Sequence, residues 1–273
     1  MRRRVVGFGL VITTATGLVA SAGMTGASAA ASASQIVLAP NHRIDAKPGG
    51  GGGGGGGVPA WPGWASSNWS GYAVTNGDYK SVSGQWTVPT VPAKGSGFSA
   101  AWIGIGGFNT ADLIQTGTEQ DSVNGKAQYA AWWTTSDLGY AEQVIPGFVV
   151  NPGDVINASV VKSKRGSTWT MTLSDGSQSF SKSVQFTSSE SSAEWIMEAP
   201  GLGPKRIAPI ANYGADVFDP GTVNGTASPA FTAADGGILI QKNVVVSIPS
   251  APDSDADGFA IAYGSQQPQP PGS

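Results

Sequence analysis

The chain has 273 residues, of which 40% are apolar and 12% are charged, and its formal net charge is −3. Its 40 glycines and 18 prolines argue against long helices, because both residue types destabilise helix interiors. The absence of cysteine excludes disulfides and cysteine-based metal sites or nucleophiles. The acidic balance disfavours nucleic acid and anionic membranes as partners.

Residues 1–29 are typical of a secretory signal peptide. Three arginines follow Met1, residues 5–20 are apolar and small, and Ala27-Ser28-Ala29 fits the small-residue cleavage pattern. No later segment is apolar over the roughly 18 residues that a membrane-spanning helix needs. We therefore expect a secreted, extracellular protein.

Residues 30–59 form a low-complexity stretch that contains an unbroken glycine run at 49–57. Such a run behaves as a flexible coil. The stretch is either a tether, that is a Gly-rich linker, or a removable propeptide. We favour the propeptide, because an exported hydrolase benefits from being kept inactive until it is released.

Residues 60–273 read as one domain of short β-type runs separated by Gly, Pro, Asn and Asp. Alternation is clear at 83–88 and 169–173, and Ser174-Asp175-Gly176-Ser177 is a hairpin signal. About a dozen short strands predict an all-β domain, a two-sheet antiparallel β-sandwich. The expected strands are 70–74, 81–88, 99–105, 113–118, 127–134, 142–149, 155–162, 168–173, 178–186, 193–198, 217–223, 238–246 and 259–263.

The tryptophans all lie after residue 58. Several must be core residues because of their large apolar area. Trp132 and Trp133 are adjacent, so on a strand they point to opposite faces. One of them can be buried while the other lines an open face, which suits an extended ligand such as a peptide or a sugar chain.

The only histidine, His42, precedes the predicted domain. The domain therefore has neither histidine nor cysteine, which excludes a Ser-His-Asp triad, a Cys-His pair and a histidine-based zinc site. Carboxylate chemistry is the natural default, and the chain has only five glutamates. They are Glu119, Glu142, Glu190, Glu194 and Glu198.

Two of these glutamates lie in one expected strand, Glu194-Trp195-Ile196-Met197-Glu198. Both carboxylates belong on one face, but about 13 Å apart along the strand, so at most one can be at a reaction centre. Isolated strand glutamates usually line a solvated face. The apolar run around this pair favours a functional purpose instead, since a buried carboxylate needs a partner.

Several motifs resemble those of the glutamic peptidases, the eqolisins. They keep their order from about Ser66 to Tyr263, and the resemblance implies a β-sandwich of concanavalin-like shape and endopeptidase activity. We expect a secreted, bacterial-type member that works as a monomer on a polypeptide substrate, without cofactor or metal. The matching runs are Asn68-Trp69-Ser70-Gly71-Tyr72, Val82-Ser83-Gly84-Gln85-Trp86-Thr87-Val88-Pro89, Trp102-Ile103-Gly104-Ile105, Leu113-Ile114-Gln115-Thr116-Gly117, Tyr129-Ala130-Ala131-Trp132-Trp133, Pro152-Gly153-Asp154, Ala193-Glu194-Trp195-Ile196-Met197-Glu198 and Pro209-Ile210-Ala211-Asn212-Tyr213-Gly214.

The catalytic pair that this resemblance implies is Gln115 and Glu198. A carboxylate at Glu198 takes a proton from the attacking water and returns it to the leaving amine. The Gln115 amide donates to the developing oxyanion, a contribution of about 3–4 kcal/mol for one such donor. A base with a carboxylate pKa implies an acidic optimum. Expected substrate-binding residues are Trp69, Trp102, Trp132 and Glu194.

Three positions depart from the family pattern. Gly106, Ala130 and Thr134 stand where members of the family have acidic residues. Fewer neighbouring carboxylates should lower the pKa of the remaining one, because like charges favour protonation. We therefore expect the rate, the pH profile or the substrate choice to differ.

A second acidic motif, Asp253-Ser254-Asp255-Ala256-Asp257-Gly258, matches the first half of a calcium loop. The glutamate expected at its twelfth position is replaced by Gly264. We therefore interpret the motif as a polar turn rather than a metal site.

Two other function classes fit the same predicted fold. One is a polysaccharide-binding or glycoside-cleaving sandwich, and the other is a non-catalytic secreted binding protein related to the peptidases. A glycosidase needs two carboxylates about 5–10 Å apart, which Gln115 with Glu198 does not supply.

Overall fold

The structure is a computed structural model that describes residues 38, 40–46, 60–203, 206–225 and 228–273. Residues 37–273 form one compact unit. The predicted signal peptide, and the glycine run of the predicted propeptide or linker, lie outside the described residues. Among the residues that are described, no helix is long and apolar enough to cross a membrane.

The described residues form fifteen strands and one short 3₁₀ helix, η1 (Ser136–Leu138). The strands are β1 (Trp64–Ser66), β2 (Trp69–Thr75), β3 (Ser81–Thr87), β4 (Ala100–Gly106), β5 (Leu113–Val123), β6 (Lys126–Thr135), β7 (Gln143–Val144), β8 (Val155–Lys162), β9 (Thr168–Ser174), β10 (Ser179–Gln185), β11 (Ser192–Glu198), β12 (Ala215–Val223), β13 (Gly236–Gln241), β14 (Val244–Pro249) and β15 (Phe259–Tyr263).

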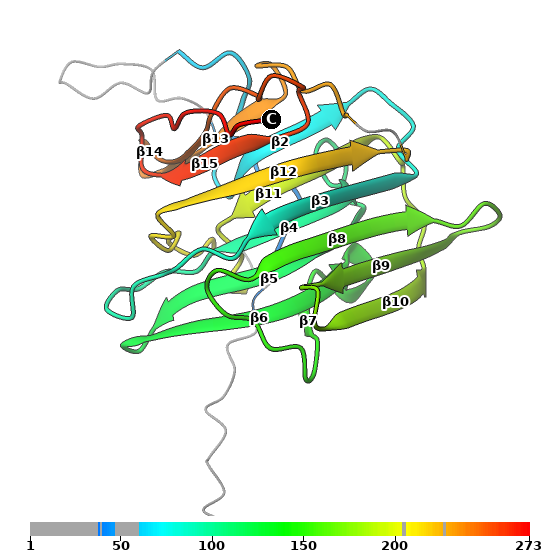
Figure 1. Cartoon of the computed structure of the whole chain (residues 1–273), viewed down its shortest axis with the longest axis horizontal. Coiled ribbons are helices and arrows are strands. Elements are labelled where there is room, and N and C mark those ends of the chain that lie inside the picture. Colours follow the sequence, from blue (N-terminus) through cyan, green and yellow to red (C-terminus); the bar gives the residue numbers. More distant parts are fainter. Residues whose placement is uncertain (1–37, 39, 47–59, 204–205, 226–227) are drawn as a thin grey trace, which may run out of the picture. The chain divides into compact units, whose positions relative to one another are not determined.

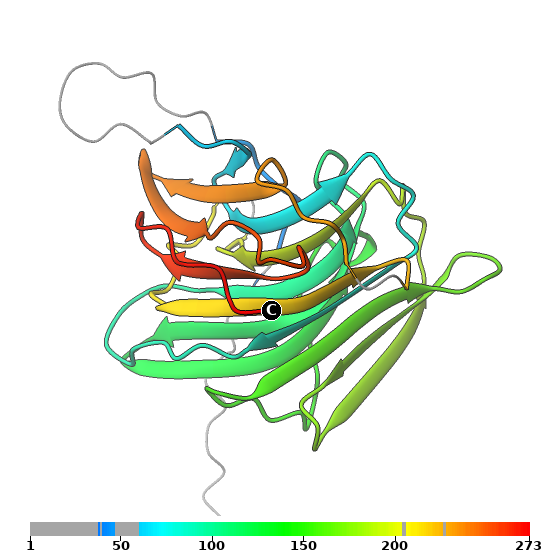
Figure 2. The same ribbon diagram turned by 45° about the horizontal axis from the view of Figure 1, so that its top comes forward.

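The strands pair in the order β10-β9-β8-β3-β12-β15-β14-β13-β2-β11-β4-β5-β6-β7, with β1 added in parallel to β13. The other pairs are antiparallel. This ladder folds over so that β8 and β9 face β4 and β5 without pairing to them (Figures 1 and 2). The predicted all-β sandwich is confirmed, and its two layers belong to one continuous ladder.

The main core lies between the two layers and includes Trp86, Trp169 and Trp195. A second cluster lies on the other face of β2, β11, β4, β5 and β6, and its tryptophans are Trp69, Trp102 and Trp132. Trp133 packs against the main core while Trp132 belongs to the second cluster, as expected for adjacent strand positions. The sheet that carries the second cluster therefore has large aromatic side chains on both faces.

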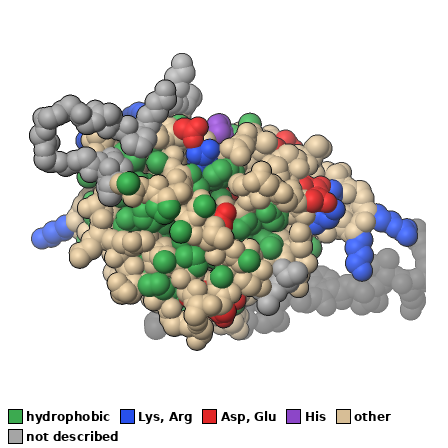
Figure 3. Space-filling model, turned by 90° about the horizontal axis from the view of Figure 1, so that it is seen from above, with side chains coloured by type: hydrophobic (Ala, Val, Ile, Leu, Met, Phe, Trp, Pro, Cys, Tyr) green, Lys and Arg blue, Asp and Glu red, His purple; other side chains and the backbone are tan. Residues whose placement is uncertain are grey.

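A third hydrophobic cluster lies on β13 and β14 and consists of Ile238, Ile240, Val245 and Ile248. Trp61 and Ala65 pack against it. Figure 3 shows the molecule from above, with hydrophobic side chains grouped among polar ones and few charged groups on this face.

Two expected strands differ from the structure. Residues 238–246 form two strands, because Lys242 and Asn243 have positive φ values of 52° and 64° and make a tight hairpin turn. Residues 142–149 pair only over Gln143–Val144, because Pro146 removes a backbone donor and Gly147 has a positive φ of 80°.

Candidate active site

Glu194 and Glu198 lie on the same face of β11, as the sequence predicts. Glu198 is opposite Trp69 of β2 and Ala100 of β4, and Glu194 is opposite Gly104 of β4. These positions share the face that carries the second hydrophobic cluster. The two glutamates therefore project from the sheet away from the main core.

The Glu198 carboxylate is fully buried and accepts three hydrogen bonds. Trp102 Nε1 donates to Oε2 at 3.0 Å, while Asn41 N and Asn68 Nδ2 donate to Oε1 at 2.9 and 3.3 Å. Burial raises the pKa of Glu198 well above its usual range, and these donors act in the opposite direction. Burial is therefore the largest influence on this pKa, and the lowering expected from fewer acidic neighbours stays a prediction.

Gly117 on β5 allows Trp102 to reach Glu198. Gly117 and Trp102 are opposite each other on β5 and β4. A Cβ atom on Gly117 would lie 2.5 Å from Trp102 Cβ and 2.3 Å from Ala101 O. The indole of Trp102 also meets Trp69 edge to face, with ring centroids 4.9 Å apart. A side chain at Gly117 would displace the indole that donates to the carboxylate.

Gln115 of β5 and Glu198 meet at a single peptide bond, the one between Pro40 and Asn41. Gln115 Nε2 donates to Pro40 O at 3.5 Å, and Asn41 N donates to Glu198 Oε1 at 2.9 Å. The first contact is long and the second is of ordinary length. The structure therefore brings the two residues of the predicted catalytic pair to the carbonyl and the amide of one peptide unit.

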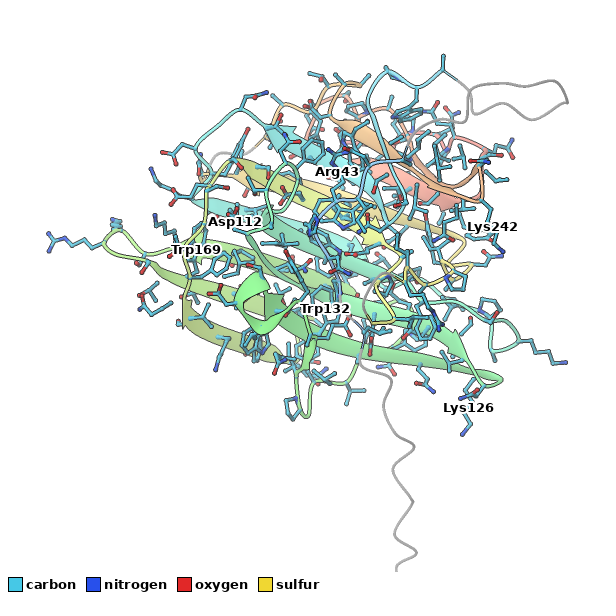
Figure 4. The ribbon with its side chains drawn as sticks, turned by 180° about the vertical axis from the view of Figure 1, so that it is seen from behind. Arg43, Asp112, Lys126, Trp132, Trp169 and Lys242 are labelled. Carbon is cyan, nitrogen blue, oxygen red and sulfur yellow. The ribbon has the colours of Figure 1, made fainter. Side chains whose placement is uncertain are left out.

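Residues 40–46 and Leu38, which we call the N-terminal segment, lie across this site. Its main chain donates to Gly107 O and Asn68 Oδ1, and it accepts from Trp69 Nε1, Asn68 Nδ2 and Glu142 N. The side chain of Arg43 adds a hydrogen bond to Phe108 O. In Figure 4, Arg43 of this segment lies above Trp132 of β6 in the view. A site that binds main-chain groups accepts an extended peptide with little regard to its side chains.

Several buried polar atoms at this site have no hydrogen-bond partner in the described part of the chain, among them Gln115 Oε1 and Trp132 Nε1. Buried polar atoms are normally paired with protein groups or ordered water. Both atoms are thus available to a water molecule or to a substrate.

Glu194 behaves differently from Glu198. It is fully buried, and neither of its carboxyl oxygens has a hydrogen-bond partner among the described residues. Burial raises the pKa of Glu194 well above its usual range. The solvated strand face that ordinarily explains such glutamates is therefore excluded.

The structure places further carboxyl groups around the site that the sequence did not assign to it. Glu119 is opposite Ala100 on β4, and Glu142 follows η1 in the chain. Burial raises the pKa of both, and the charges of Glu119, Asp121 and Glu198 raise that of Glu142 further. Glu119 and Gln115 lie at alternate positions of one strand, so their side chains are on the same face. This sequence pattern could have identified Glu119 as a neighbour of the site. Glu142 lies in irregular chain, where no such signal exists.

At one of the departing positions, Gly106, a carboxylate comes from elsewhere in the chain. A Cβ atom on Gly106 would lie 3.1 Å from Asp112 Oδ2, so Asp112 places a carboxylate beside that position. Hydrogen bonds from Ser188 and Ser189 hold this carboxylate and offset the effect of burial, and the pKa of Asp112 is lowered. The site is therefore not poor in carboxyl groups.

Residues 67–256 match the Peptidase A4 family. Aspergillopepsin-2 from Aspergillus niger is 28% identical over 215 residues, which are 66% of this chain and 74% of that protein. Scytalidopepsin B from Scytalidium lignicola is 30% identical over 141 residues, 48% of this chain and 51% of that protein. Both relatives are fungal, and the bacterial-type membership expected above stays a prediction.

Solved structures show the same fold at lower sequence identity. Scytalido-glutamic peptidase with a transition state analog inhibitor superposes with a TM-score of 0.60 at 23% identity, covering 72% of this chain and 98% of that chain. Aspergilloglutamic peptidase from Aspergillus niger gives a TM-score of 0.51 at 22% identity, covering 61% and 98%. The expected concanavalin-like sandwich agrees with these structures.

Proposed function

Because the chain belongs to the Peptidase A4 family and is a peptidase, we propose that it is an exported, acid-acting endopeptidase that uses Glu198 and Gln115. The observation that carries this proposal is the contact of both side chains with one peptide unit, Pro40–Asn41. The amide of Gln115 faces the carbonyl oxygen, where negative charge develops during hydrolysis. The carboxylate of Glu198 faces the nitrogen, which must be protonated as it leaves.

Hydrolysis proceeds in two steps at this peptide unit. Glu198 takes a proton from water while the water oxygen bonds to the carbonyl carbon, and the carbonyl electron pair moves to the oxygen. Gln115 Nε2 donates to that oxyanion, and the unpartnered Gln115 Oε1 is placed to hold the water. The C–N bond then breaks, its electron pair stays on nitrogen, and Glu198 returns the proton to the amine. The products are a carboxylic acid and an amine.

The remaining chemistry of the site supports a polypeptide substrate. Trp69 and Asn68 bind main-chain oxygens of the N-terminal segment at 2.9 and 3.1 Å. Neither contact depends on the identity of the side chain that is bound. Trp102 orients Glu198 rather than the ligand, and Trp132 offers an unpartnered N–H beside it.

The N-terminal segment supports the propeptide interpretation of residues 30–59. While it lies on Glu198, it fills the position that a substrate must take, and Pro40 is buried there. Its departure exposes the carboxylate to solvent, which lowers the desolvation that raises the pKa of Glu198. The segment is therefore an intramolecular occupant that delays activity until it is removed.

The proposed activity is tested with the purified protein and a denatured protein substrate at pH 2–7. We expect cleavage that is strongest in the acidic part of this range. Cleavage should survive EDTA, serine-directed inhibitors and thiol-directed inhibitors, because the pair needs no metal, serine or cysteine. Absence of cleavage throughout the range would favour the binding-protein alternative, and loss of cleavage in EDTA would contradict the mechanism.

The role of the segment is tested with a synthetic peptide of residues 38–46 added to enzyme that lacks residues 1–59. We expect competitive inhibition. The matched control is the same peptide N-methylated at Asn41, which lacks the N–H that donates to Glu198 Oε1. It should bind about 10-fold or more weakly, as expected for a lost hydrogen bond to a charged group. Equal inhibition by both peptides, or an active exported product that starts near Ala30, would contradict the propeptide role.

A further inference from the structure

Three aspartates from two separate parts of the chain lie close together. Asp219 lies in β12, and Asp253 and Asp257 lie in the loop that precedes β15. One carboxylate oxygen from each of the three lies within 4.8 Å of the other two. Like charges at this spacing repel one another unless a proton or a cation neutralises them.

Asp253 is the buried member of this cluster, with 8% of its surface exposed. Its Oδ1 accepts from Asp257 N at 3.1 Å, while its Oδ2 has no hydrogen-bond partner in the described ranges of the chain. The ion pairs found in these ranges involve other aspartates, Asp45 and Asp78, and Glu190. A buried carboxylate oxygen without a donor is costly, and a cation beside it would remove that cost.

Gly258 keeps the space beside these carboxylates free. A Cβ atom on Gly258 would lie 2.5 Å from Asp253 Oδ2 and 2.7 Å from Asp219 Cγ. The loop is also held in place by its main chain, because Asp253 N donates to Gly258 O at 3.0 Å and Gly221 N donates to Asp257 O at 2.7 Å. The second bond ties the loop to β12, the strand that carries Asp219.

We propose that Asp219, Asp253 and Asp257 bind a calcium ion. The sequence motif lacks the glutamate that a helix–loop–helix calcium site places at position twelve, and Asp219 supplies a carboxylate from a different strand instead. Hard carboxylate oxygens suit calcium, which accepts six to eight oxygen ligands in flexible geometry. Zinc favours nitrogen and sulfur ligands, and magnesium demands a tighter octahedral arrangement and keeps more of its water.

This inference reverses the interpretation of the motif as a polar turn. The carboxylate that the sequence motif lacks is supplied by Asp219. The fold brings residue 219 close to residue 253, and no local sequence pattern predicts that contact. The ion would join the loop before β15 to β12, next to the stacked rings of Phe218 and Phe259 in the main core. Its role is to stabilise the fold, because the Glu198 carboxylate lies on β11, on the face that carries the second hydrophobic cluster.

The proposal is tested by thermal unfolding of the enzyme at pH 7, where the carboxylates can ionise, in calcium chloride or in EDTA. A ligand that binds only the folded state raises its melting temperature. At 10 mM calcium and the roughly millimolar affinity of many extracellular sites, we expect a rise of about 3–6 °C. Magnesium chloride should give a smaller rise, and sodium chloride at equal ionic strength should give none.

Asp253→Asn should abolish the calcium-dependent rise, and Asp175→Asn in the distant β9–β10 hairpin is the matched control that should keep it. If Asp253→Asn does not fold, Asp257→Asn provides the same test at a less buried position. Titration calorimetry of the wild-type protein should find one calcium ion per chain. The proposal is overturned if calcium does not bind, if sodium chloride reproduces the rise, or if both Asp253→Asn and Asp257→Asn keep it. Peptide cleavage in EDTA well below the melting temperature tests the proposed activity separately.

Discussion

Glu198 and Asp253 are both buried carboxylates, but their surroundings are opposite. Glu198 accepts hydrogen bonds from a ring N–H, a side-chain amide and a main-chain N–H of the N-terminal segment. Among the residues that the structure describes, Asp253 has one oxygen with a single donor and another with none, and it faces two more carboxylates. Donors around one carboxylate suit a group that gains and loses a proton, whereas clustered carboxylates without donors suit a cation.

Replacing Gln115 tests whether the activity depends on the site around Glu198 and not on the aspartate cluster. Gln115→Ala removes the amide that faces the carbonyl oxygen and should lower kcat about 10²–10³-fold, the usual cost of one oxyanion donor. The calcium-dependent rise in melting temperature should not change. Steady-state kinetics on a peptide substrate measure the first effect.

Gln120→Ala is the control for this change, because Gln120 is a buried glutamine of the same strand whose side chain donates to Thr118 instead. It should cleave the substrate at close to the wild-type rate. Equal losses in the two variants would mean that the effect of Gln115→Ala comes from a general disturbance of β5.

Removing one hydrogen-bond donor to Glu198 tests how the surroundings of this carboxylate set its pKa. Trp102→Phe keeps an aromatic ring and loses the N–H that donates to Oε2. This donor lowers the pKa of Glu198, so its loss raises that pKa, and the acid limb of the pH–rate profile should move to higher pH. We also expect the maximal rate to fall about 10-fold.

Trp169→Phe is the matched control for this shift. Trp169 is a fully buried tryptophan of the main core whose Nε1 has no hydrogen-bond partner within the described residues. The change has a similar cost in packing, so it should lower stability without moving the pH–rate profile. A shift of the profile in both variants would contradict a specific role for Trp102.

Other buried carboxyl groups are neither the proposed catalytic base nor proposed calcium ligands, and they should make the stability of the fold depend on pH. Burial raises their pKa values, to about 9 for Asp121, so the folded state keeps protons that the unfolded state releases above about pH 4. Their contribution to stability is complete below pH 4 and is lost as the pH rises through the folded pKa values. The groups are Glu119, Asp121, Glu142, Glu194 and Asp216.

In EDTA, which removes the calcium contribution, the melting temperature should therefore be highest near pH 4. It should fall by about 3–5 °C per pH unit for each proton that only the folded state retains. Thermal unfolding followed by circular dichroism at pH 4–8 measures this. A melting temperature that rises over this range would contradict the assigned direction of these pKa values.

The sequence predicts the layers of this fold better than its details. Alternation and turn residues locate most strands, and β8 and β15 begin and end where expected. The hairpin at Lys242-Asn243 was missed because apolar β-type residues stand on both sides of it and the turn itself contains no glycine or proline. The N-terminal segment was not expected to pack on the domain, since the hydrogen bonds that place it on Glu198 and Gln115 come from its main-chain groups, which carry no sequence signal.

The candidate sites show the same limit. Gln115 and Glu198 were identified through motifs that lie on regular strands. Glu142 and Asp219 were not, because each reaches its cluster through a contact between residues far apart in the chain. The calcium motif was interpreted as a turn for that reason, since its missing ligand lies on another strand.

The central claim is that Glu198 is the base that drives peptide hydrolysis. The most direct test compares the kcat/KM of wild type, Glu198→Gln and Glu190→Gln on one peptide substrate at the acidic optimum. Glu190 lies in the loop before β11 and forms an ion pair with Lys162. Its replacement by glutamine is the same chemical change as at Glu198. We predict a loss of about 10²–10⁴-fold for Glu198→Gln only, with cooperative unfolding and the calcium response retained. Full activity of a folded Glu198→Gln variant would contradict the claim.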